Sequence, residues 1–528
     1  MKKILTSLMA VCVIASSSFA ITSLQWGYSY GLFENDVYMA ADPLYIFKVE
    51  KNITDLGWRG FNATMNTVNW DGMIGLMTGL PVRITLAVND TENISPMSNF
   101  SLSTNIRQNG TNFANSTIAG NLTLDNSQRN IKLVASLINS DAMKLGISYE
   151  LIMNMNNRSG TLDNLGAQQG NLVSNALATN NGTIWNTLTL GYNPGNRQST
   201  NTITHILTPA VKMGDMQIYI PISYRLVENA TIGSYGETNV FPTNTITTPV
   251  ASNQNWVNNT SVNYFGLGAA TRMTLAKDIG LKLYASLNAA LGMRFNGATA
   301  INSGRRDYVP AVGYTSNVTV SNVTYQDGYM ALPLSTSNCL YMNTRIADNK
   351  IKLGAGLGLE ATYTPESYVQ STTNFTLMGS NGYSYQLQTP TANTTSMNVQ
   401  TIAGSIFVPA AVQIDCTEWL AIRAGIQPRF AYSYSSTTST SVPNKITSTL
   451  ITNGVTTTTT NFGAGNETAS TNVAGLASWT TGVAYSVGLT FTVSKDFTID
   501  MQYVNTGTVV ATDIWSLGNW SIQASMRF

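Results

Sequence analysis

The stretch Ile279–Phe295 reads IGLKLYASLNAALGMRF. Every second residue, beginning with Ile279, is apolar, whereas the residues between them are polar, small or charged and include Lys282 and Arg294. Because successive side chains of a β-strand point to opposite faces, this alternation predicts a strand with one fully apolar face. A helix would distribute both sets around its circumference, so the period of two excludes it.

The apolar face of this stretch is too long for an ordinary strand of about 5–6 residues. A strand that crosses a bilayer needs about 9–11 residues, with an apolar side toward lipid and a polar side toward the lumen. The stretch is therefore predicted to be one wall strand of a transmembrane β-barrel, provided that the rest of the chain repeats the pattern.

The composition of the 528-residue chain agrees with this prediction. Only 10% of the residues are charged, against about 25% in soluble proteins, while 43% are hydrophobic. The only long apolar run lies at the N-terminus, so a bundle of membrane-spanning helices is not predicted.

That N-terminal run has the features of a secretory signal peptide covering residues 1–20. Lys2 and Lys3 precede an apolar stretch, and small residues at Ser18 and Ala20 suit cleavage before Ile21. Cleavage removes two lysines, which changes the formal net charge from +1 to −1. The overall charge therefore indicates no particular partner.

Alternating segments recur in pairs from Ile131 to the C-terminus. Thirteen strands are predicted there: Ile131–Ile138, Met143–Met153, Ile203–Met213, Met216–Leu226, Val262–Leu275, Ile279–Phe295, Leu340–Ile346, Ile351–Tyr363, Ile402–Ile414, Trp419–Tyr434, Trp479–Val493, Phe497–Tyr503 and Asn519–Phe528. Within a pair the turn is short, and between pairs long Asn/Thr-rich loops are expected at Glu228–Ser261, Asn296–Asn338, Pro365–Val399 and Ser435–Ser478. Short turns on one side and long loops on the other are typical of outer-membrane barrels.

The last segment alternates and ends in Phe528. A final strand of this kind behind a cleaved signal peptide resembles bacterial outer-membrane β-barrel proteins, whose aromatic C-terminus is read by the barrel assembly machinery. The resemblance is one of architecture and identifies no specific family. It implies an antiparallel transmembrane β-barrel in the outer membrane, in contact with lipid and lipopolysaccharide.

The strand count depends on the N-terminal part of the chain. Adding Pro81–Val88 gives 14 strands, and adding Leu24–Leu32 and Gly72–Met77 gives 16. We expect 16, with 14 to 18 as the range. In this division residues 21–80 form an N-terminal segment that supplies either first strands or a plug in the lumen, and residues 81–528 form the barrel.

The alternation also assigns side chains to the lumen. Ten residues are predicted to line a pore: Arg83, Arg225, Arg272, Lys282, Arg294, Arg345, Lys352, Glu360, Arg423 and Arg429. With Lys132, Lys144, Arg527, Glu150, Asp415 and Asp500, the inward set has 12 basic and 4 acidic members. Rings of Arg or Lys favour anions. The alternative is that these charges pair with acids of the N-terminal segment inside a filled barrel, because Phe33–Trp58 is rich in charge.

Other classes of function lack the residues they need. The single histidine, His205, has apolar residues at the positions of its own strand face, and no His/Cys cluster suits a metal. Cys339 and Cys416 are expected near opposite rims, too far apart for a disulfide. No catalytic residues, cofactor, metal site or nucleic-acid partner are predicted.

Three functions are consistent with these features. The first is porin-like passive diffusion of small polar solutes with a mild preference for anions, in a protein that could form a homo-oligomer. The second is a plugged transporter for apolar substrates, resembling the long-chain fatty-acid channels, with a hatch lined by Tyr45, Ile46, Phe47, Trp58 and Phe61. The third is a closed barrel that acts through its outer loops as a surface or adhesion protein.

Overall fold

The structure is a computed structural model, and it describes most of the chain. The described residues are 39–59, 66–78, 82–108, 111–161, 186–190, 197–240, 250–294, 298–309, 315–348, 350–380, 384–443, 446–452, 455–461, 470–505 and 520–528. The signal peptide predicted at residues 1–20 and the strand predicted at Leu24–Leu32 lie outside them.

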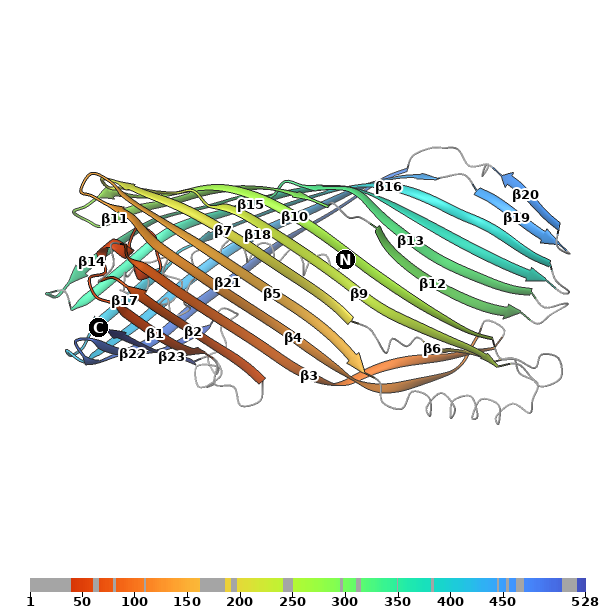
Figure 1. Cartoon of the computed structure of the whole chain (residues 1–528), viewed down its shortest axis with the longest axis horizontal. Coiled ribbons are helices and arrows are strands. Elements are labelled where there is room, and N and C mark those ends of the chain that lie inside the picture. Colours follow the sequence, from red (N-terminus) through yellow and green to blue (C-terminus); the bar gives the residue numbers. More distant parts are fainter. Residues whose placement is uncertain are drawn as a thin grey trace.

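The described residues form one antiparallel sheet that closes on itself (Figure 1). Its sixteen wall positions are, in chain order, β1 (Ile53–Arg59), β2 (Asn66–Leu76), β3 (Ile84–Gln108), β4 (Thr111–Asn139), β5 (Lys144–Thr161), β7 (Arg197–Met213), β8 (Met216–Tyr219) with β9 (Ile222–Val240), β10 (Val250–Ala276), β11 (Leu281–Met293) with β12 (Ala298–Val309), β13 (Thr315–Ala331) with β14 (Leu334–Ile346), β15 (Ile351–Ser380), β16 (Ser384–Phe407) with β17 (Ala410–Asp415), β18 (Leu420–Pro443), β21 (Ser470–Ser494), β22 (Phe497–Asn505) and β23 (Trp520–Arg527). Pairing of β1 with β23 closes the barrel, and so the prediction of 16 antiparallel strands is confirmed.

Three wall strands are interrupted by proline. Pro221 separates β8 from β9, Pro333 separates β13 from β14, and Pro409 separates β16 from β17. Proline has no N–H to donate to a neighbouring strand. Each of these prolines still accepts a hydrogen bond through its carbonyl from a neighbouring strand, so the sheet stays continuous.

The two ends of the barrel differ. At the end where β10 turns into β11 and β14 into β15, connections are short and follow directly on the membrane-facing residues; we call it the short-turn end. Toward the other end the strands continue far beyond the apolar band, to the right in Figure 1. For example, β15 has 30 residues, which is about 100 Å of strand, against an apolar band of about 25 Å.

These extensions correct the expectation of long loops. The range Pro365–Val399 lies almost entirely within β15 and β16, and most of Glu228–Ser261 lies within β9 and β10. Three further strands, β6 (Asn186–Leu190), β19 (Ile446–Thr452) and β20 (Val455–Asn461), add to the sheet at this end. The sequence of these ranges is rich in Ser, Thr, Asn and Gln, so the alternation that reveals a membrane strand is absent there.

The outer face of the barrel carries exposed large apolar side chains at alternate positions. On β15, Leu357 and Leu359 are 57% and 50% exposed, whereas Gly358 between them is buried. On β11, Leu287 is 62% exposed and Ser286 is buried. A closed sheet with such an outer face satisfies its backbone hydrogen bonds internally and suits a lipid environment.

The wall begins earlier in the chain than Pro81. Strand β1 lies within the charge-rich range Phe33–Trp58, and β2 pairs with both β1 and β3. Residues 39–50, just before β1, are not part of the sheet. They include the one-turn 3₁₀ helix η1 (Ile46–Lys48).

Among the described residues, no helix is long and apolar enough to cross a membrane.

Candidate functional site

Residues 39–50 pack inside the barrel at the short-turn end, where they appear in red in Figure 1. We call them the plug segment. Ala40 and Ile46 are completely buried, and Leu44 and Val49 are 2% and 3% exposed. Such burial of a segment outside the sheet requires contact with the inner wall.

Two apolar clusters provide that contact. Leu44 packs with Ala210, Tyr219 and Ala270, which belong to β7, β8 and β10. A second cluster joins the plug segment to the wall through β1 to β4; its wall members are Ile53, Met73, Ala87 and Val134, and its plug members include Ala40, Ile46, Phe47 and Val49. The plug segment thus lies against the neighbouring wall strands from β1 to β10 at this end.

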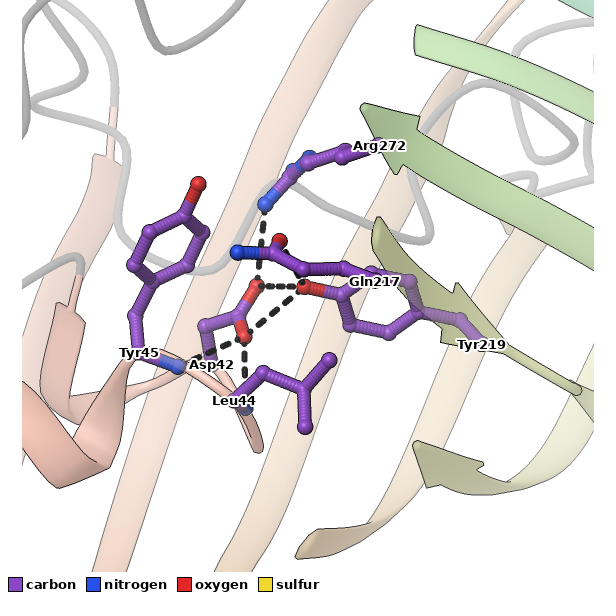
Figure 2. Close-up of polar contacts among 6 residues, drawn as sticks. All are labelled: Asp42, Leu44, Tyr45, Gln217, Tyr219 and Arg272. Atoms are coloured by element: carbon purple, nitrogen blue, oxygen red, sulfur yellow. Dashed lines mark hydrogen bonds and ion pairs between the residues drawn. The ribbon is translucent and has the colours of Figure 1, made fainter. Parts of the chain in front are cut away.

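The buried carboxylate of Asp42 is the polar centre of the plug segment (Figure 2). Its Oδ2 lies 3.2 Å from Nη1 of Arg272, and the side chains of this ion pair are only 6% and 12% exposed. The hydroxyl of Tyr219 lies 3.1 and 3.2 Å from the two carboxylate oxygens, and 3.2 Å from Oε1 of Gln217. A buried charge of this kind is stable only when it is paired and hydrogen-bonded.

The same carboxylate also shapes the plug segment itself. Oδ1 of Asp42 accepts hydrogen bonds from the amides of Leu44 and Tyr45, at 2.8 and 3.1 Å. Asp followed by Pro43 is a typical start for a helical turn, because Asp caps free amides and proline lacks the first one. Asp42 therefore fixes both the local turn and its position against the wall.

Arg83 on the wall holds the other half of the plug segment. Its Nη1 donates to the carbonyls of Ile46, Phe47 and Val49, at 3.0, 2.6 and 2.7 Å. These carbonyls belong to η1 and the residue after it; that of Ile46 also accepts from the amide of Val49, whereas carbonyls at the end of a helical turn in general lack further helical partners. Arg83, predicted to line a pore, thus binds the plug segment's backbone.

Gly146 on β5 allows the plug segment to approach the wall closely. A Cβ atom at this position would overlap the carbonyl of Pro43. No side chain fits between the two backbones, so only glycine can occupy this position.

Polar contacts also anchor the chain where it leaves the plug segment. Nζ of Lys51 lies 2.6 Å from Asp496 in the turn between β21 and β22, and this bond lowers the pKa of the Asp496 carboxyl. The carbonyl of Asn52 accepts a hydrogen bond from the amide of Phe528 at 2.9 Å. The exit of the plug segment and the C-terminus of the chain therefore meet at the short-turn end.

Several predicted lumen residues form ion pairs within the wall. Arg429 pairs with Glu360 at 3.0 Å, Arg423 with Asp500 at 3.4 Å, and Lys352 with Asp415 at 3.6 Å. Lys282 lies 6.0 Å from the ring of Tyr341, and Arg345 is exposed on β14. Whether these ten residues border an open, water-filled passage stays a prediction.

Two of the predicted residues instead meet tyrosines farther from the short-turn end. Arg225 on β9 lies 4.1 Å from the ring of Tyr264 on β10, and Arg294, just after β11, lies 5.1 Å from the ring of Tyr329 on β13. The hydroxyls of Tyr264 and Tyr329 are 3.1 Å apart. With Tyr368 on β15, stacked on Tyr329 at 6.3 Å, these five residues form what we call the arginine–tyrosine row.

Two kinds of residue were missed from the sequence. Asp55 and Asp71 face the lumen from β1 and β2, and Asp55 bonds to Gln523 and Ser525 on β23. The tyrosines of the row were also missed, although the alternation that selected Arg225 and Arg294 could have found Tyr264 by the same rule; Tyr329 and Tyr368 lie in ranges predicted to be loops.

Other expectations for this region have mixed outcomes. Tyr45, Ile46 and Phe47, predicted to line an apolar hatch, are buried against the wall and not presented to a passage. Trp58 belongs to β1, and Phe61 lies outside the described residues. Cys339 and Cys416 are both free thiols, and in the described ranges no group of three His, Cys, Asp or Glu side chains could hold a metal ion.

Comparison with known proteins gives matches in structure alone. No family model and no curated protein matches the chain. Among solved structures, a ferric enterobactin receptor mutant from Pseudomonas aeruginosa aligns with 90% of this chain and 80% of its own, at 8% identity and a TM-score of 0.30. The ferric-catecholate import receptor Fiu from E. coli K12 aligns over 90% and 81% (8% identity, TM-score 0.29), and the siderophore receptor PiuA from Acinetobacter baumannii over 90% and 81% (8%, 0.28).

The closed barrel and its apolar outer face define the class of protein. It is a bacterial outer-membrane β-barrel protein, as the alternation and the C-terminal strand predict. Its lumen is occupied at the short-turn end by the plug segment.

Proposed function

We propose that the protein is a plugged outer-membrane transporter whose plug segment, residues 39–50, closes the inner end of the lumen. One observation carries the proposal: an ion pair, three carbonyl hydrogen bonds and two apolar clusters hold this segment against the inner wall. Short turns face the periplasm in barrels of this kind, so the closed end is the periplasmic one.

The inner wall between the arginine–tyrosine row and the plug segment favours polar solutes. Many inward-facing side chains at this level are polar or charged, although Phe407 lies beside Arg429; the polar ones include Ser286, Asn288, Ser337, Glu360, Ser405 and Arg429. A polar lumen suits hydrated solutes, whereas an apolar substrate would need an apolar lining. We therefore keep the plug of the second hypothesis and the polar solutes of the first.

The decisive experiment is a conductance measurement in planar bilayers. Full-length protein is compared with a variant in which residues 39–50 are replaced by a Gly/Ser segment of equal length. We expect brief or small openings for the wild type and steady openings of several-fold higher conductance for the variant, because the replacement removes every wall contact but keeps the chain length.

The matched control uses an ion pair on the outside of the barrel. Arg129 and Asp90 lie 3.3 Å apart, close to the 3.2 Å of Arg272 and Asp42, but their side chains face away from the lumen. Asp90→Asn should leave conductance unchanged. Equal, steady conductance of wild type and replacement variant would contradict the plug and support passive diffusion. Silence from both, in folded protein, would favour a closed barrel that acts through its outer end.

A further inference from the structure

The arginine–tyrosine row crosses five neighbouring wall positions on the lumen side. Arg225 pairs in register with Tyr264, Tyr264 pairs with Gly292, and the amide of Arg294 bonds to the carbonyl of Tyr329 at 3.3 Å. A Cβ atom at Gly292 would overlap the ring of Tyr264, so this glycine lets the ring lie flat on β11. The row is therefore a continuous lining of the wall.

The row lies on the outer side of the plug segment. Tyr264 and Arg272 occupy the same face of β10, eight residues apart, which is about 27 Å along the strand. Arg272 binds the plug segment, and Tyr264 lies farther from the short-turn end. A solute that enters from outside would reach the row before the plug segment.

Hydrogen bonds link the row to one acid. Arg225 bonds to the hydroxyl of Tyr264, the two tyrosine hydroxyls bond to each other, and the hydroxyl of Tyr329 bonds to Glu366. The row thus has two guanidinium groups and one nearby carboxylate, which gives it a net positive charge. The carboxylate lies at the Tyr329 end, which leaves the Arg225 end the more positive.

Arg225 has donors to spare. Its Nε is buried and has no hydrogen-bond partner among the described residues, and no acid in the described ranges forms an ion pair with it. A guanidinium carries five N–H donors in a planar fork that matches the oxygens of carboxylate or phosphate. A buried donor without a partner is unfavourable, and a bound oxyanion would satisfy it.

From this geometry we infer that the arginine–tyrosine row is a binding site for the oxyanion group of a small solute, a carboxylate or a phosphate, with Arg225 as the principal contact. The guanidinium of Arg294 and the hydroxyl of Tyr264 complete the site. The inference deepens the proposed function, because it names the chemical class of solute that the lumen takes up ahead of the plug segment.

Binding is tested without transport, on the full-length protein refolded in non-ionic detergent. Line broadening in the ³¹P spectrum of inorganic phosphate, titrated against protein, gives the affinity, and ¹³C-labelled acetate is titrated in the same way. We expect Arg225→Gln with Arg294→Gln to weaken binding at least tenfold. Arg225→Lys with Arg294→Lys should weaken it less, because the charge stays and the fork is lost.

Arg129→Gln is the matched control, since it removes the same charge from the outer face. It should change the affinity less than twofold. Tyr264→Phe is a milder variant that keeps the ring and can be used if the double arginine variant does not fold. It is expected to weaken binding severalfold.

Two results would overturn the inference: no phosphate or acetate binding by the wild type, or equal affinity of the wild type and the row variants. Stronger binding of one probe identifies the preferred oxyanion. Because the outer end of the lumen gives access whether or not the plug segment moves, oxyanion binding with unchanged conductance of the plug variant would contradict the proposed function alone.

Discussion

Arginine and tyrosine meet at two levels of the same lumen, and their partners differ. At the short-turn end, Arg272 lies 5.5 Å from the rings of Tyr45 and Tyr219 and pairs with Asp42 of the plug segment. In the arginine–tyrosine row, Arg225 has Tyr264 beside it but no carboxylate within ion-pair distance in the described ranges.

The comparison shows how one set of side chains can serve two purposes. Where the chain supplies its own carboxylate, the guanidinium fixes a segment of the protein. Where it does not, the same group keeps unused donors that suit an anion from outside. Four changes test whether the contacts of the plug segment keep it in place against the wall. They are given from the largest expected effect on channel opening to the smallest.

The largest effect is expected from Asp42→Ala. The substitution removes the partner of a buried guanidinium, which costs about 3–5 kcal/mol, and it also removes the cap on Leu44 and Tyr45. At about 1.4 kcal/mol per factor of ten, the open fraction of channels should rise on the order of 100-fold or more. Single-channel recording measures it, with Asp90→Ala as the control. An unchanged open fraction would show that Asp42 does not hold the plug segment in place.

A somewhat smaller effect is expected from Arg83→Gln. Three carbonyls of the plug segment lose a charged donor, and hydrogen bonds to charged groups contribute about 1.5–3 kcal/mol each, although they do not add fully here because one nitrogen serves all three. The plug segment should become cleavable by a protease added from the short-turn side. If cleavage of variant and wild type proceeds at the same rate, the carbonyl contacts do not hold the segment.

Gly146→Ala tests the close approach of the two backbones. The added methyl group must displace the carbonyl of Pro43, and overpacking of this kind costs about 1–3 kcal/mol. The expected result is a rise in open fraction of roughly tenfold, with little change in the thermal stability of the barrel, because β5 itself is unaffected. Gly482→Ala is a suitable control, since a Cβ atom there meets nothing within 4 Å. Equal behaviour of the two variants would argue against close packing at Pro43.

The smallest effect is expected at the exposed contact of Lys51 and Asp496. The bond lowers the pKa of Asp496 below its ordinary value of 3.8, so its contribution is complete above that value and is lost as the pH falls through the lowered pKa. Openings of the wild type should therefore increase slightly below about pH 4. Asp496→Asn should lack this step, and an identical pH profile in both proteins would exclude the contact as its cause.

Much of the barrel could be predicted because lipid imposes a strict rule on the sequence. Lipid on one side and polar groups on the other produce the alternation of Ile279–Phe295, and the same rule placed Arg272 and Glu360 on the inner wall. The rule does not apply beyond the apolar band, because lipid does not contact the strands there. There, the sequences of the β15 and β16 extensions are rich in Ser, Thr, Asn and Gln and resemble loops.

The plug segment could be suspected from its charge but not located. Asp42 is one acid among several in a short stretch, and its partner Arg272 follows 230 residues later. Only the closed barrel brings them together. Strand β1 was missed for a similar reason: ITDLGWR has Asp55 and Gly57 on its inner face, and seven residues are too few for the alternation to stand out.

The seam between β1 and β23 bears on the order in which the molecule is assembled. Residues at the two ends of the described chain pair there, and the amide of Phe528 bonds to the carbonyl of Asn52, two residues beyond the plug segment. Contacts between residues so far apart in sequence form late, because closing a loop of that length is entropically costly. Until the seam closes, the sheet is open beside β1, and the plug segment can be laid against the inner wall from the side. Afterwards the finished ring encloses it, so the last hydrogen bonds of folding also retain what was placed inside.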